Sequence, residues 1–150
     1  MNKIRQIIPL LVLLLLTSCN AHKKYSDFDY SYSRSGGYAP VYENFLIKGN
    51  TAHYSFEGHG KKVKKDFKLS PEEIRVLEEV LTTNNFRMIQ EDRKKLYDNI
   101  ATAIVVKKGS NTASKSDASF IMPAHQQRWE SVVKAFQHLI ASKTQLIPAK

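Results

Sequence analysis

Histidine, aspartate and glutamate are the side chains of this chain that could hold a metal ion or transfer protons. His53 and His59 flank Glu57, and Asp98 stands just before a strongly apolar run. Imidazole nitrogens and carboxylate oxygens bind zinc, and a histidine or a carboxylate can act as a general base. These residues support one hypothesis, in which the protein is a small hydrolase or metal-dependent enzyme that uses His53, His59 and Asp98.

The spacing of these side chains forms no recognised metal or catalytic motif. Metal-binding histidines normally stand at hairpin or helical spacings with a third ligand close by, and an aspartate at a strand entrance usually forms a turn. The chain contains no Gly-rich phosphate loop, GxSxG elbow or HExxH sequence. We therefore predict no metal site, cofactor or catalytic residue. We expect His125 to lie in the core near a helix end and His138 to be solvated.

The only cysteine, Cys19, ends a segment with three zones. Residues 1–6 carry Lys3 and Arg5 without an acidic residue, and residues 7–16 are apolar except for one proline. A basic start, a short apolar core and small residues at the exit are typical of a secretory signal peptide. Ten residues of helix reach about 15 Å, only half of a hydrocarbon core about 30 Å thick. The apolar run therefore predicts export and not a membrane span.

The four residues Leu16-Thr17-Ser18-Cys19 resemble the lipobox of bacterial lipoproteins, an aliphatic residue and two small residues before a cysteine. The resemblance implies that residues 1–18 are a removed signal peptide and that Cys19 carries a diacylglycerol group on its thiol. Acyl chains at this position make the free energy of membrane binding more favourable by about 0.8 kcal/mol per buried methylene. Asn20 is compatible with transfer to the outer membrane. The alternatives are an ordinary cleaved signal peptide and a buried cysteine.

Charge and cysteine content limit the classes of function for the exported chain. The formal net charge of +9 falls to +7 when Lys3 and Arg5 are removed with the signal peptide. A lipidated Cys19 leaves no thiol for a disulfide, a catalytic cysteine, a CxxC redox pair or a cysteine-ligated metal. An exported, membrane-tethered protein rarely meets nucleic acid, so we do not expect nucleic acid as a partner.

A row of lysines is the most distinctive surface feature. The segment KKVKKDFKL alternates as a strand with one basic face would, and its lysines are Lys61, Lys62, Lys64, Lys65 and Lys68. As a binding surface, this row suggests contact with an acidic envelope protein or with phosphate groups of anionic lipid or lipopolysaccharide. As a structural device, lysines on a sheet edge prevent edge-to-edge aggregation. Both interpretations remain open at this point.

Strand patterns fill the chain on both sides of a predicted helix. Phe28, Tyr30 and Tyr32 alternate with polar residues before a Ser-Gly-Gly turn, and they form either a core face or an exposed recognition patch, of which we favour the core. Gly49-Asn50 predicts a hairpin between residues 41–48 and 51–56, followed by a turn at 57–60. Further along, residues 100–108 and 113–122 predict a second strand pair.

Two helices complete the pattern. Ser70, Pro71 and Glu73 predict a capped helix over residues 71–83, and Trp129 begins an amphipathic spacing in a helix opened by Pro123. The order is three or four strands, a helix, two strands and a helix. We therefore predict an α+β domain over residues 27–147, a curved antiparallel sheet of five or six strands with both helices on one face, joined to Cys19 by a tether that ends at residue 26.

Two short stretches resemble small uncharacterised lipoprotein domains of bacterial envelopes. They are Ser33-Arg34-Ser35-Gly36-Gly37 after an aromatic strand, and Leu69-Ser70-Pro71-Glu72-Glu73 at a helix start, with Tyr97-Asp98 ahead of a hairpin. The resemblance covers about residues 27–141. It implies a single domain and carries over no functional residue. From all these features we expect a lipid-anchored, non-enzymatic envelope protein that binds a protein partner or an anionic envelope component.

Overall fold

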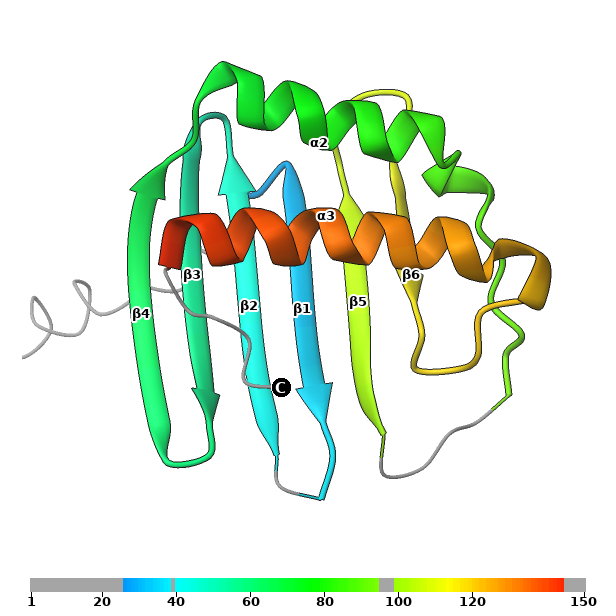
Figure 1. Cartoon of the computed structure of the whole chain (residues 1–150), viewed down its shortest axis with the longest axis horizontal. Helices are drawn as coiled ribbons and strands as arrows, with labels where there is room; N and C mark the ends of the chain where they lie inside the picture. The colour runs from blue at the N-terminus through cyan, green and yellow to red at the C-terminus, as the bar shows by residue number, and fades with distance from the viewer. Residues whose placement is uncertain (1–25, 39, 95–98, 145–150) are drawn as a thin grey trace, which may run out of the picture.

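The protein forms one six-stranded antiparallel sheet with two α-helices, an α+β fold as predicted (Figure 1). The computed structural model describes residues 26–38, 40–94 and 99–144. The strands and helices, in chain order, are β1 (Tyr30–Gly36), β2 (Val41–Lys48), β3 (Thr51–Gly58), β4 (Lys61–Lys68), α2 (Pro71–Thr83), η3 (Phe86–Met88), β5 (Ile100–Val106), β6 (Ala113–Ser116), η4 (Pro123–His125) and α3 (Gln126–Thr144). Cys19, the predicted signal peptide, the tether up to residue 25 and Asp98 lie outside the described residues.

The strand order across the sheet is β4-β3-β2-β1-β5-β6. The first four strands form a meander of consecutive hairpins, and β5 then pairs with the free side of β1. Tyr30 of β1 lies opposite Ile47 of β2 on one side and Val106 of β5 on the other. This arrangement places β1 in the interior of the sheet and β4 at one edge.

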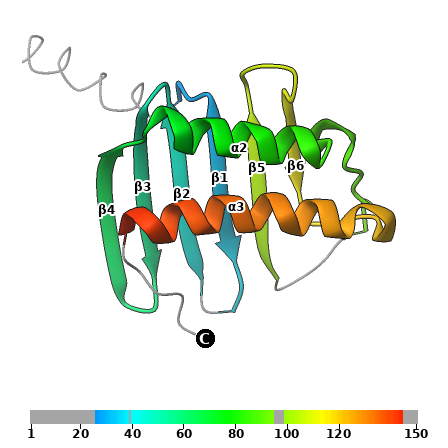
Figure 2. The ribbon, with the colours of Figure 1, turned by 45° about the horizontal axis from the view of Figure 1, so that its top comes forward.

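Both helices cover the same face of the sheet. In Figure 1, α2 begins beside β4 and crosses the strands toward β6, and α3 returns in the opposite direction. The turned view in Figure 2 shows both helices on one side of the strands. Between the helices and the sheet lies a single buried cluster that includes Tyr32, Phe45 and Phe136, each fully buried. The ring of Tyr32 stacks on Phe136 with centroids 5.6 Å apart, so the tyrosines of β1 belong to the core, as favoured from the sequence.

The start of α2 confirms the predicted cap. The Ser70 hydroxyl accepts a hydrogen bond from the Glu73 backbone N–H, and the Glu73 carboxylate accepts from the Ser70 backbone N–H at 2.7 Å. These two bonds satisfy donors that a helix start leaves free. The other carboxylate oxygen of Glu73 forms an ion pair with Lys143 of α3 at 2.7 Å. One residue therefore caps α2 and joins it to α3.

The bounds of several strands differ from the predictions, and β5 ends at Val106, two residues before the predicted end. β1 begins at Tyr30 and continues through Gly36, which the sequence pattern assigned to a turn. Gly36 has φ +110°, and a Cβ there would lie 2.5 Å from the backbone oxygen of Asn99, so only glycine fits. β3 extends to Gly58, because the turn needs only His59 and Gly60. These two residues have φ 50° and φ 72°, the left-handed pair that a two-residue hairpin turn requires.

The predicted strand over residues 113–122 is also shorter, since β6 ends at Ser116. Asp117 stops the ladder because its carboxylate accepts hydrogen bonds from the Thr102 backbone N–H and from the Trp129 indole N–H. The chain pairs again only at an isolated bridge between Ile121 and Glu91. Among the described residues, no helix is both long enough and apolar enough to span a membrane.

Candidate functional site

The face of the sheet opposite the helices is the candidate binding surface, and we call it the open face. Side chains of successive residues in a strand point to opposite faces of the sheet. In β1–β4, every second residue points into the core, and the residues between them point to the open face. No helix or strand among the described residues lies across it in either view (Figures 1 and 2). Its central part is polar, with Ser33, Asn44 and Ser55 side by side in one cross-strand row that ends at Lys64.

β4 supplies most of the charge at one side of this face. All five lysines of the predicted basic row lie on this edge strand and are exposed. Lys62, Lys64 and Lys68 lie on the open face, whereas Lys61 and Lys65 alternate to the helix side. The five lysines of β4 are therefore divided between the two faces of the sheet, and only three of them lie on the open face.

Two of the open-face lysines have partners on β3. Lys62 forms an ion pair with Glu57 at 2.9 Å, and Lys68 donates to the Thr51 hydroxyl at 2.8 Å. Both side chains of the Lys62 pair are more than half exposed, so the pair contributes little to stability. Lys61, Lys64 and Lys65 form no ion pair with any carboxylate among the described residues. The edge keeps an excess of positive charge that the described fold does not neutralise.

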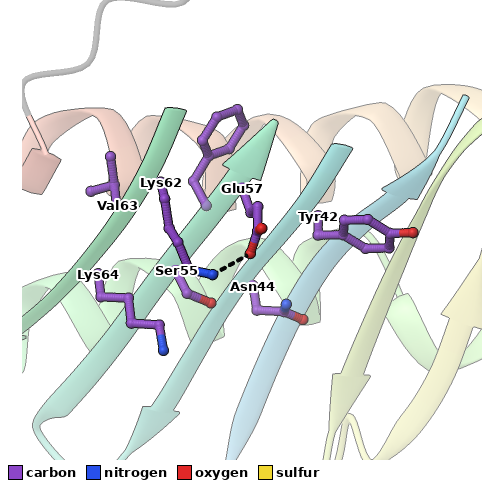
Figure 3. A pocket seen from close by; sticks show the side chains of 8 residues that line it. Tyr42, Asn44, Ser55, Glu57, Lys62, Val63 and Lys64 are labelled. Carbon is purple, nitrogen blue, oxygen red and sulfur yellow. Dashed lines mark ion pairs between the residues drawn. The ribbon is translucent and has the colours of Figure 1, made fainter. Parts of the chain in front are cut away.

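A shallow hollow lies beside these lysines on the open face (Figure 3). Its volume is about 140 Å³, and its polar lining comprises Tyr42, Asn44, Ser55, Glu57, Lys62 and Lys64. Figure 3 shows these side chains on the side of the sheet away from the helices, with Lys62 reaching toward Glu57. Ligand pockets for small molecules usually measure about 300–1,000 Å³. The hollow is therefore large enough for a single charged group and too small to enclose a larger substrate.

The donors around the hollow suit an oxyanion. Lys64 offers an ammonium group, Asn44 an amide N–H₂, and Ser55 a hydroxyl. A phosphate or carboxylate oxygen bound here would gain a charge-assisted hydrogen bond from Lys64. Glu57 limits the site on one side, because its carboxylate repels an anion unless Lys62 stays between them. The arrangement favours an anion that approaches from the β4 side.

The histidines of the enzyme hypothesis do not come together. His53 lies on β3 and contacts Asp66 of β4, whereas His59 lies in the β3–β4 turn. Five residues of β3 lie between them, which places the two about 20 Å apart. No group of three histidine, cysteine, aspartate or glutamate side chains able to hold a metal ion occurs in the described ranges.

The other two histidines that the sequence singled out lie near α3. His125 was expected in the core, but it is only half-buried. Its Nδ1 accepts a hydrogen bond from the Gln90 backbone N–H at 2.9 Å, and this polar contact replaces core packing. His138 is exposed on α3, as predicted.

A buried polar cluster was missed from the sequence. Glu43 of β2 is nearly buried on the helix side, where it accepts a hydrogen bond from the Tyr54 hydroxyl at 2.9 Å and lies 3.4 Å from the Arg34 guanidinium. Burial and the negative charge of Glu43 raise the pKa of Tyr54. One feature of the sequence did indicate that Glu43 is buried, since Glu43 alternates with Val41 and Phe45 on the inward face. The cluster links β1, β2 and β3, and its groups satisfy one another.

No family model matches the chain, and no curated protein matches its sequence.

Proposed function

We propose that this protein is a lipid-anchored, non-enzymatic component of the bacterial envelope that binds an anionic partner along β4 and the adjoining open face. The partner would be an acidic envelope protein or the phosphate groups of anionic lipid or lipopolysaccharide. The observation that carries the proposal is the uncompensated charge of β4, where Lys61, Lys64 and Lys65 are exposed without an ion pair among the described residues.

The electrostatics of the edge support this proposal. Five lysines and one aspartate lie within the eight residues of β4, so positive charge is dense over about 25 Å of strand. Such a charged strip raises the rate at which an anionic partner is captured. The attraction acts over a Debye length of about 8 Å at physiological ionic strength, so it requires close approach.

The anchor rests on the lipobox resemblance at Cys19. Ten residues separate Cys19 from Tyr30, the first residue of β1, and they span at most about 36 Å when fully extended. A domain held on so short a connection would bind its partner close to the membrane surface. We propose the outer membrane as that surface, with which Asn20 is compatible.

A charge-reversal variant tests the proposal. Lys62→Glu, Lys64→Glu and Lys68→Glu combined should weaken binding of the purified protein to vesicles containing phosphatidylglycerol, or to an acidic protein captured by crosslinking in its own envelope. The matched control is Arg87→Glu, Lys108→Glu and Lys134→Glu, three exposed basic residues away from β4 that carry the same total change. Added salt should weaken binding of the wild type. Equal loss in both triple variants, or binding that salt does not affect, would overturn the role of β4.

A further inference from the structure

The outer edge of β4 carries backbone groups that the described sheet does not use. β4 ends the sheet, and no described segment pairs with its outer side. The other edge strand, β6, has only four residues, whereas β4 has eight. A long exposed edge is a ready template for an additional strand.

The register identifies which backbone groups point outward. The Leu69 N–H donates to the Asn50 carbonyl at 2.9 Å, and the pairing continues with Phe67 opposite Ala52 and Lys65 opposite Tyr54. Hydrogen-bonded pairs alternate along an antiparallel ladder, so Lys61, Val63, Lys65 and Phe67 bond to β3. The N–H and C=O groups of the alternate residues therefore point away from the sheet. These residues are Lys62, Lys64, Asp66 and Lys68.

The same four residues place their side chains on the open face, and three of them are lysines. In a neighbouring strand, the residues directly opposite would have Cβ atoms about 4.5–5.5 Å away, where opposite charges attract and like charges repel. A second copy of β4 paired antiparallel over its full length would place Lys62 opposite Lys68 and Lys64 opposite Asp66, so its repulsive and attractive pairs would be equal in number. An acidic strand would instead pair all three lysines with carboxylates, and only the residue opposite Asp66 would meet a like charge. The charge of this row therefore favours an acidic partner strand over a second copy.

The helix side of β4 adds an apolar requirement at two positions, Val63 and Phe67, which alternate with Lys61 and Lys65. Val63 and Phe67 are half-buried and pack against the core, with the Phe67 ring 6.0 Å from the ring of Phe45. Apolar side chains opposite Val63 and Phe67 in an added strand would continue this layer. The segment that fits the edge therefore alternates acidic and apolar residues.

We propose that β4 accepts an extended polypeptide segment of alternating acidic and apolar residues as a seventh, antiparallel strand. This inference rests on the proposed function, since it specifies the anionic partner as a polypeptide bound by main-chain pairing. Backbone hydrogen bonds with Lys62, Lys64 and Lys68 would supply the pairing, and the side chains of the same three lysines would supply the selectivity.

A synthetic ten-residue peptide of alternating glutamate and valine, labelled with a fluorophore, is the probe. Its binding to the purified full-length protein in nonionic detergent is followed by fluorescence anisotropy. Two matched peptides carry methyl groups on backbone nitrogens. In one peptide the glutamate nitrogens are methylated, and in the other the valine nitrogens are methylated. The glutamate amides would face β4 and the valine amides would face solvent, so methylation of the glutamates should abolish binding and methylation of the valines should preserve it.

A pair of protein variants tests whether the outward backbone N–H of β4 is needed for peptide binding. Lys64→Gln and Lys64→Pro both remove the charge, but only the proline also removes the outward N–H. We expect Lys64→Pro to bind the peptide at least about ten-fold more weakly than Lys64→Gln, with circular dichroism as the check that both are folded. Hydrogen exchange gives a second readout, because the backbone amides of Lys62, Lys64 and Lys68 should become protected when the peptide binds.

The outcomes separate this inference from the proposed function. Equal binding of the two N-methylated peptides would show that charge alone acts, which overturns strand addition and leaves anion binding intact. Binding to phosphatidylglycerol vesicles but to no peptide would overturn the polypeptide segment and keep the function. If neither probe binds in a manner that depends on the β4 lysines, both proposals fail.

Discussion

The Tyr54 hydroxyl donates a 2.9 Å hydrogen bond to the carboxylate of Glu43, on the neighbouring strand and beneath the helices. Removing this donor would leave a charged acceptor with one partner fewer in a nearly buried site. We expect Tyr54→Phe to lower the free energy of unfolding by about 1.5–3 kcal/mol, the range for hydrogen bonds to charged groups. Tyr42→Phe is the control, because Tyr42 is 55% exposed and should change stability little. Urea unfolding that gives equal stabilities for the two variants would contradict this role.

Alkaline pH should unfold the protein through its core tyrosines. Burial raises the pKa of Tyr32 to about 12, and it also raises the pKa values of Tyr30 and Tyr54. The folded state therefore favours the protonated phenol. This contribution is present in full below the ordinary pKa near 10, and it is lost as pH rises through about 12. Tyrosinate absorbance and far-ultraviolet circular dichroism should change together above pH 10. Tyrosinate formation with the fold intact would be inconsistent with this expectation.

The entry of the chain into β1 is held by Asp29. Its carboxylate accepts hydrogen bonds from the Gly49 backbone N–H at 2.8 Å and from Lys48 at 3.1 Å, and these bonds lower its pKa below the usual 3.8. The resulting stability is present above the ordinary aspartate pKa and is lost as pH falls through the lower folded value. We expect Asp29→Ala to destabilise the protein by about 1–2 kcal/mol at pH 7 and by less near pH 3.

Asp27→Ala provides the matched control for Asp29. Asp27 also forms an ion pair with Lys48, but its side chain is 73% exposed. Exposed pairs contribute at most about 1 kcal/mol and are screened by salt. Thermal unfolding at pH 7 and pH 3 distinguishes the two variants. A pH-independent effect of Asp29→Ala would show that packing, and not ionisation, explains the loss.

Cys19→Ala tests the proposed anchor. Without the thiol no lipid can be attached, so the variant should accumulate unprocessed or be found in the soluble fraction. Cell fractionation and the mass of the mature N-terminus measure both effects. A variant that is processed and stays in the membrane would show that the lipoprotein interpretation is wrong.

Several elements were predictable because the contacts that define them are local. The cap formed by Ser70 and Glu73 spans three residues, and α2 has the predicted bounds. Gly49 and Asn50 close the β2–β3 hairpin as expected. The end of β6 was not predictable in the same way, since Asp117 leaves the ladder to bind Thr102 and Trp129 from other elements.

The candidate site was visible only in part. The lysines of β4 are evident in the sequence, and their alternation with other residues predicts a strand. The sequence alone does not show that β4 is an edge strand with lysines on both faces of the sheet, or that a hollow lies beside Lys64. Both features depend on which strands are neighbours. Glu43 shows the same limit, because its partner Tyr54 comes from another strand.

By itself, the sequence determined the α+β class, the capped helix, the main hairpin and the expectation of a lipid at Cys19. Each depends on the order of residue types or on contacts within a few residues. Only the tertiary structure decided that β4 is an edge and that β1 lies inside the sheet, between β2 and β5. Those positions result from pairing between distant segments, such as Tyr30 with Val106. Long-range pairing of this kind follows from the burial of a shared core, which no local pattern specifies.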